Sequence, residues 1–195
     1  MTHTLHRLGD AKSLKEDYVV LIARAQGFYA PGRVGLSRKF PRLYSMIKKT
    51  AEKLGIIKTL GIGGGFGVTV LNNKDQLTSY LKKLKERKRK AGVSIVVSGL
   101  FDEVNDCLNK LDLSPHTVLF SLGYFGKIEL LPRKEVLEIT TMCGHHMISP
   151  RLVEKLASDM KDEKITSGEA VRLMARQCVC GAFNKARACK LIEAV

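Results

Sequence analysis

The sequence predicts a mixed fold of sheet and helix, α/β or α+β, with a layered N-terminal domain and a small helical C-terminal region that carries cysteines. Three observations predict it. Runs of β-branched residues are typical of strands, apolar residues at helical spacing lie between them, and residues 136–195 have helical patterns only. We place an α/β domain at 1–135 and a helical, metal- or cluster-binding region at 136–195.

The predicted N-terminal domain alternates strands and helices. Tyr18–Ala23 is an unbroken apolar run, as expected of a strand covered on both faces. Asp75 is a candidate cap for a helix that continues to about Lys90. The other expected strands are 68–71, 93–97, 117–120 and a return strand from 128 to 131, and the other expected helices are 41–54 and one that opens at Ser98 and Gly99.

The C-terminal region has three helix-start signals. Ser149 with Pro150 begins the first helix, Thr166 or Ser167 begins the second, and Asn184 begins the third, because these residue types cap helices or fit their first turn.

Composition narrows the class of protein. The chain has 195 residues, 45% of them hydrophobic, with 17 glycines, 5 prolines and 5 cysteines, which excludes a disordered tail, a collagen-like fibre and a disulfide-dense miniprotein. No apolar run approaches the roughly 18 residues that span a bilayer, and residues 1–6 lack the apolar stretch of a signal peptide. We therefore expect a cytoplasmic protein with no membrane contact and with thiols or metal ligands in place of disulfides.

The net charge of +14 lies entirely in the first 90 residues, because residues 91–195 hold 13 basic and 13 acidic side chains. The densest run of basic residues lies at the end of a predicted helix. Its ordinary interpretation is that these side chains are simply exposed to solvent there. The alternative is a basic binding module for nucleic acid, an acidic partner protein or a phosphorylated ligand. The candidate anion-binding residues are Lys82, Lys83, Lys85, Arg87, Lys88, Arg89 and Lys90.

A glycine-rich stretch spans Gly61–Gly67. It satisfies neither G-x-G-x-x-G nor a P-loop, because Phe66 and Val68 stand where glycine would be needed and no Gly-Lys-Ser/Thr follows. We interpret it as a turn or bulge between two strands, with a mobile lid over a ligand as the alternative.

The cysteines are more informative. Cys143 lies in a polar bend ahead of the helix at Ser149, and Cys178 and Cys180 lie at the end of the helix before Gly181. Residues two apart point to opposite sides of a helix, so Cys178 and Cys180 converge only if the chain leaves the helix there. Cys107 lies on an apolar helical stripe and is expected to be a core thiol.

These positions predict a metal centre on Cys143, Cys178 and Cys180. The candidate fourth ligands are Cys189, His145, His146 or a group from outside the protein, although Cys189 also fits a packing position on its helix. We expect an iron–sulfur cluster, with zinc as the alternative, because Cys-x-Cys differs from the two-residue knuckles of structural zinc. Such a centre implies a redox or cluster-handling role, with a redox partner protein, and leaves the oligomeric state and any reaction open.

Several segments also resemble an uncharacterised family of small proteins from anaerobic microbes. They cover about the second half of the chain: Val96-Val97-Ser98-Gly99-Leu100-Phe101-Asp102, Pro115-His116-Thr117-Val118, Ser121-Leu122-Gly123, Thr140-Thr141-Met142-Cys143-Gly144-His145 and Cys178-Val179-Cys180-Gly181. The start, Thr2-His3-Thr4-Leu5-His6, extends the resemblance. It implies an anaerobic setting in which clusters are stable, and no particular activity.

A Cys/His-dependent enzyme is the further alternative. Cys143 near a helix start, with His145 or His146 close by, has the composition of an activated nucleophile, and His116 lies in a turn where open α/β sheets often place functional residues. This hypothesis gives no reason for Cys178-x-Cys180, so we rank it below the metal centre.

Overall fold

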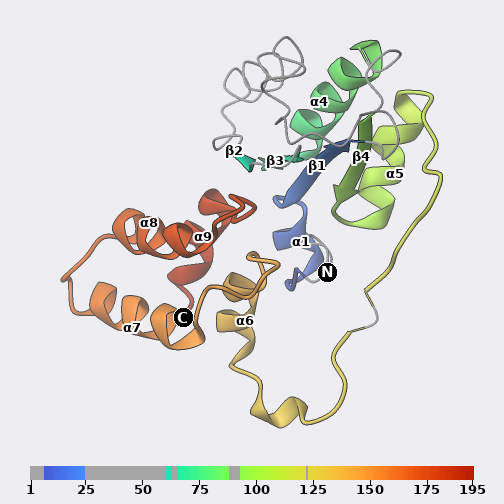
Figure 1. Cartoon of the computed structure of the whole chain (residues 1–195). Coiled ribbons are helices and arrows are strands. Elements are labelled where there is room, and N and C mark those ends of the chain that lie inside the picture. Colours follow the sequence, from blue (N-terminus) through green and yellow to red (C-terminus); the bar gives the residue numbers. More distant parts are fainter. Residues whose placement is uncertain (1–6, 25–59, 63–65, 88–92, 122) are drawn as a thin grey trace. The chain divides into compact units, whose positions relative to one another are not determined.

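The computed structural model describes residues 7–24, 60–62, 66–87, 93–121 and 123–195 (Figure 1). It has the expected mixed architecture of sheet and helix, in two compact units. The sheet unit is Lys15–His116, and the helical unit combines the described part of Met1–Leu14 with Thr117–Val195. The boundary predicted at 135/136 therefore lies inside the helical unit, which also includes a segment from the start of the chain.

The sheet has four antiparallel strands in the order β2-β3-β1-β4. Central strand β1 (Tyr18–Arg24) pairs with β3 (Phe66–Leu71), with Tyr18 opposite Leu71, and with β4 (Val93–Ser98), with Val19 opposite Ser98. The short edge strand β2 (Leu60–Ile62) pairs with β3. Because β3 and β4 both run antiparallel to β1, they are parallel to each other and form a split β-α-β unit around it.

Among its described residues, the sheet unit also contains two helices. They are α4 (Lys74–Arg87) and α5 (Phe101–Lys110). The core lies between them and one face of the sheet, and five of its members are Tyr18, Val20, Tyr80, Leu84 and Cys107. The strand prediction for β1 is confirmed, because the side chains from Tyr18 to Ile22, which alternate between the two faces, are all buried.

Local hydrogen bonds explain where α4 begins. The Asn73 side chain accepts from the Gln76 backbone N–H at 2.8 Å, and the Gln76 side chain accepts from the Asn72 backbone N–H at 2.8 Å. Asn73 therefore occupies the capping position that we assigned to Asp75, which instead lies in the first turn.

The glycine-rich stretch joins β2 to β3. The expectation of two strands around this stretch is confirmed, since β2 and β3 pair antiparallel, with Gly61 opposite Gly67 and Ile62 opposite Phe66. Residues 63–65 themselves, and the helix predicted at 41–54, lie outside the described residues.

The helical unit contains four main helices, α6 (Lys134–Thr140), α7 (Pro150–Lys161), α8 (Ser167–Gln177) and α9 (Lys185–Ile192). A single turn, α1 (Ala11–Leu14), precedes the sheet. Helix α6 contacts α7 and α9, and α8 also contacts α7 and α9. The predicted starts at Ser149, Thr166 and Asn184 are confirmed, since each is the N-cap of its helix.

Two predicted strands are wrong. Among the described residues of 117–131, the chain has no strand, and Ile128–Leu130 is the 3₁₀ turn η2. β-branched and aromatic residues favour a strand only when a partner strand supplies hydrogen bonds and packing, and here Leu119, Phe120, Phe125 and Leu130 are exposed. In the part of the chain that the structure describes, no helix is long and apolar enough to cross a membrane.

Candidate metal centre

Cys143 lies in a tight turn between α6 and α7. Helix α6 ends at Thr140, the Cys143 backbone N–H donates to the Thr140 carbonyl at 3.2 Å, and the His146 N–H donates to the Cys143 carbonyl at 2.8 Å. His146 has a φ of 53°, which reverses the chain direction. The turn buries Cys143 completely and leaves His145, His146 and Met147 exposed.

Cys178 and Cys180 lie in the turn that ends α8. Cys178 is the C-cap residue, and the Gly181 N–H donates to the Cys178 carbonyl at 3.1 Å with a Gly181 φ of 73°. Because the chain leaves the helix here, both cysteines are buried while Val179 between them is 67% exposed. The predicted convergence of the two cysteines is confirmed, with their Sγ atoms 3.6 Å apart.

Hydrogen bonds join all three thiols. A hydrogen bond from the Cys178 thiol lowers the pKa of Cys143 to about 6, with help from the backbone N–H groups of Met147 and His145 and against the effect of burial. The same bond, a bond to Cys180 and burial all raise the pKa of Cys178. We call Cys143, Cys178 and Cys180 the thiol cluster.

In the metal-free state, the hydrogen bond between Cys143 and Cys178 favours one negative charge on this pair. Cys143 is the thiolate at neutral pH and Cys178 is the neutral donor that stabilises it. Across the described residues, no three His, Cys, Asp or Glu side chains stand in the arrangement of a preformed metal site. The thiols have the donor chemistry of such a site, and bringing three thiolates onto a metal requires their protons to leave and their side chains to adjust.

The other candidate ligands differ in position. Cys189 is half-buried on α9, and none of the thiol hydrogen bonds given above involves it. His145 and His146 are exposed next to Cys143. Cys107 and His116 belong to the sheet unit, where Cys107 is a core thiol as predicted and accepts a hydrogen bond from the Thr78 hydroxyl at 3.2 Å.

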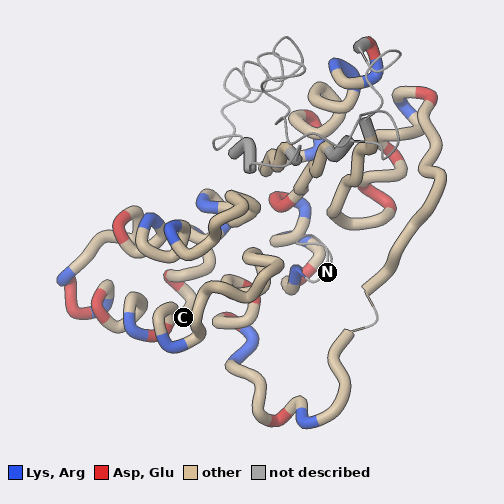
Figure 2. Tube along the Cα trace, viewed as in Figure 1, with Lys and Arg blue, Asp and Glu red and all other residues tan. Residues whose placement is uncertain are grey.

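The basic run is only partly described. Lys82 and Lys85 are exposed on α4, but the Lys85 ammonium donates to the carbonyls of Leu111 and Asp112, at 2.5 and 3.3 Å, just beyond the end of α5. Lys85 is therefore engaged within the sheet unit, and residues 88–90 lie outside the described residues. Basic and acidic residues alternate along α7 (Figure 2), whereas α8 has Glu169 in its first turn and Arg172 and Arg176 further on.

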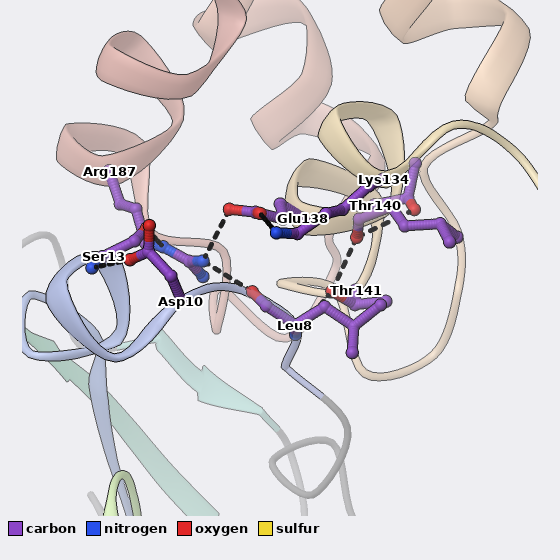
Figure 3. A network of polar contacts seen from close by, with 9 residues as sticks. Leu8, Asp10, Ser13, Lys134, Glu138, Thr140, Thr141 and Arg187 are labelled. Atoms are coloured by element: carbon purple, nitrogen blue, oxygen red, sulfur yellow. Dashed lines mark hydrogen bonds and ion pairs between the residues drawn. The ribbon is translucent and has the colours of Figure 1, made fainter. Parts of the chain in front are cut away.

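A polar network close to the thiol cluster was not predicted. Arg187, 1% exposed, donates to the Leu8 carbonyl and to the Ser13 hydroxyl and forms an ion pair with Glu138 (Figure 3). One feature of the sequence could have indicated this network: Arg187 lies on the same side of its helix as the apolar residues Ala188 and Ile192. Its partners lie too far away along the chain for spacing to identify them.

Together, the fold and this site define a class: an α+β protein with a split β-α-β sheet and a separate helical unit that holds a buried cluster of three thiols. Comparisons of the chain with protein-family models, with curated proteins and with solved structures find no match. The resemblance to a family from anaerobic microbes therefore stays a prediction.

Proposed function

We propose that Cys143, Cys178 and Cys180 hold a metal centre, and that this centre is an iron–sulfur cluster in a redox or cluster-handling protein. The observation that carries the proposal is the shared hydrogen bonding of the three buried thiols, with Cys178 linked to both Cys143 and Cys180. Three thiols gathered from two turns and hydrogen-bonded to one another have the donor chemistry that a metal or cluster site uses.

Backbone geometry supports the same proposal. N–H groups of His145 and Met147 stabilise negative charge on Cys143, and such N–H groups also tune thiolates that bind iron. Two thiolates on one tetrahedral zinc ion stand about 3.8 Å apart, from a Zn–S length of about 2.3 Å. The 3.6 Å between Cys178 and Cys180 is also compatible with a single metal ion, so zinc is the alternative that the experiment must separate.

Three thiols are one ligand short of a full set for a cluster and for structural zinc alike. A structural zinc site has four protein ligands, and here three thiols share hydrogen bonds while Cys189 takes no part in those bonds. Three ligands leave one position for Cys189, a histidine or an external group. An external ligand at that position would permit substrate binding or cluster transfer.

The test is anaerobic purification of the full chain, followed by metal and sulfide analysis and a visible spectrum. We expect iron with acid-labile sulfide, lost in Cys143→Ser and in Cys178→Ser and retained in Cys107→Ser, which changes a buried thiol of the other unit. Cys189→Ser identifies the fourth ligand. Zinc without sulfide would mean that the three cysteines form a zinc site and not an iron–sulfur cluster. Wild-type protein that stays metal-free after reconstitution with iron and sulfide would refute the proposal.

A further inference from the structure

The segment Arg7–Leu14, which we call the N-terminal strap, is bonded to both turns of the thiol cluster. The Arg7 guanidinium donates to the carbonyl of Ala182, two residues after Cys180. The Leu8 backbone N–H donates to the Thr141 hydroxyl oxygen at 3.1 Å, two residues before Cys143. The strap therefore joins two turns that are distant in the sequence.

Arg187 fastens the strap to the helices. Its Nη2 donates to the Leu8 carbonyl at 2.5 Å and its Nε donates to the Ser13 hydroxyl at 2.9 Å, while Glu138 Oε2 lies 3.5 Å from Nη2 (Figure 3). A buried guanidinium is stable only when its charge and its donors are paired. Arg187 on α9 thus depends on acceptors from the strap and on a carboxylate from α6.

The strap has the local sequence that this path requires. Gly9 has a φ of +150°, and a Cβ at this position would collide with Arg187 Nη2 and lie 3.3 Å from Glu138 Oε2. The Asp10 side chain accepts from the Ser13 N–H at 2.6 Å and starts α1. Any side chain at Gly9 would therefore displace the guanidinium that holds the strap.

We infer that the strap positions the thiol cluster, with Arg7 and Thr141 as its positioning residues. The Thr141 hydroxyl accepts from Leu8 and donates to the Leu137 carbonyl at 2.7 Å, so it connects the strap, the end of α6 and the Cys143 turn. Arg7 does the same for the Cys180 turn. The inference rests on the proposed function only where it concerns metal, since positioning of the thiols exists without metal.

Thiol accessibility in the metal-free, reduced full chain tests the inference directly. Iodoacetamide labelling, read at each cysteine by mass spectrometry, is compared for wild type, Arg7→Gln and Thr141→Val. Loss of one anchoring hydrogen bond should speed alkylation of Cys143 and Cys178 at least about fivefold, because local opening becomes more frequent. Cys189 on α9 and Cys107 in the sheet unit should keep their rates.

Matched variants separate positioning from general destabilisation. Arg172→Gln removes an exposed arginine whose ion pair to Glu169 stays within α8, and it should leave every rate unchanged. Arg7→Lys keeps the charge and a donor, and it should restore most of the protection. Unchanged rates in Arg7→Gln and Thr141→Val would overturn the inference, and so would an equal rise at Cys189, since that result means unfolding of the whole helical unit.

Metal supplies a second readout. In reconstituted protein, Arg7→Gln and Thr141→Val should lose iron to a chelator at least about fivefold faster than wild type or Arg172→Gln. Equal rates of loss in all four proteins would contradict a positioning role at the loaded centre. If the wild-type chain takes up no metal at all, the proposed function fails, and the alkylation rates alone then decide whether the strap positions the thiols.

Discussion

Cys143 and Cys178 have opposite proton affinities although they share a hydrogen bond. The bond lowers the pKa of Cys143 to about 6 and raises the pKa of Cys178. A thiolate and a thiol side by side are more stable than two thiolates in a buried place, because the second charge would be repelled and desolvated. The pair therefore keeps a single charge over a wide range of pH.

This difference predicts how the stability of the metal-free, reduced protein depends on pH. Cys143 ionises at a lower pH when folded than when unfolded, near 8.5, so the free energy of unfolding should rise between about pH 6 and 8.5. Cys178 keeps its proton when folded and loses it when unfolded, so stability should fall above about pH 8.5. Urea unfolding at several pH values measures both slopes.

Cys143→Ser is the control for this profile. Serine does not ionise in this range, so the rise between about pH 6 and 8.5 should disappear in the variant. A rise of equal size in Cys143→Ser would assign it to another group and contradict the pKa shift.

Gly99, between β4 and α5, packs directly on the buried ring of Tyr18. A Cβ there would lie 2.6 Å from Tyr18 Cδ1 and 3.1 Å from Val104 Cγ2. Gly99→Ala should therefore lower the free energy of unfolding by about 1–3 kcal/mol, because the added methyl group fits only if the buried Tyr18 ring moves. Gly67→Ala is the control in the same sheet, since a Cβ at Gly67 meets nothing within 4 Å. Equal destabilisation of both variants, by calorimetry or urea, would contradict this explanation.

At the scale of elements, helix starts are encoded by a few neighbouring residues. Thr166 and Glu169 form a capping box, in which the Glu169 N–H donates to the Thr166 hydroxyl at 3.3 Å and the Thr166 N–H donates to the Glu169 carboxylate at 2.9 Å. These two bonds satisfy N–H groups that the helix leaves unpaired. This locality explains why the start of α8 could be predicted.

The capping box yields a prediction for the helical unit. Thr166→Ala should reduce its free energy of unfolding by about 1 kcal/mol, since the hydroxyl acceptor is lost at an exposed position with no change of packing. Thr166→Ser retains the hydroxyl and should cost little. The measurement is helical circular dichroism during urea unfolding, and an alanine variant as stable as wild type would show that α8 does not depend on its cap.

The segment Thr117–Leu131 shows that residue composition alone does not identify a strand. Its β-branched and aromatic residues have the composition of a strand, yet the described residues there form no strand and expose Val118, Leu119 and Phe125. Strand propensity reports how a side chain fits a pleated, half-buried surface, and it cannot supply the neighbouring strand.

At the scale of the whole molecule, the chain builds two units with separate cores. The helical unit is discontinuous, because the sheet unit, Lys15–His116, is inserted between the strap and Thr117. Separate cores are expected to unfold in separate steps, so we expect the unfolding of this chain to depart from a single two-state transition.

Core truncation in one unit should therefore leave the other unit intact. Val20→Ala, in the fully buried middle of β1, should destabilise the sheet unit by about 2–3 kcal/mol through loss of packing. Hydrogen exchange read by mass spectrometry should show faster exchange in β1, β3 and β4 and unchanged protection in α7 and α8. Ala157→Gly in α7 is the reciprocal variant, and uniform loss of protection in either variant would mean that the units unfold together.

Much of the architecture follows from short stretches of sequence. The strands β1, β3 and β4, the starts of α7, α8 and α9, and the exit of Cys178 and Cys180 from their helix are all set by residues within a few positions of each other. Periodicity and capping act over that range, so these features were predictable.

The remaining features depend on contacts between distant parts of the chain. They include the strand order, the burial of Arg187 and the return of the strap to the helical unit. The same local patterns are compatible with many chain paths, and the path is selected by long-range packing and by the pairing of buried polar groups. For that reason the cysteines could be named from the sequence, whereas Arg7 and Thr141 beside them became visible only in the folded protein.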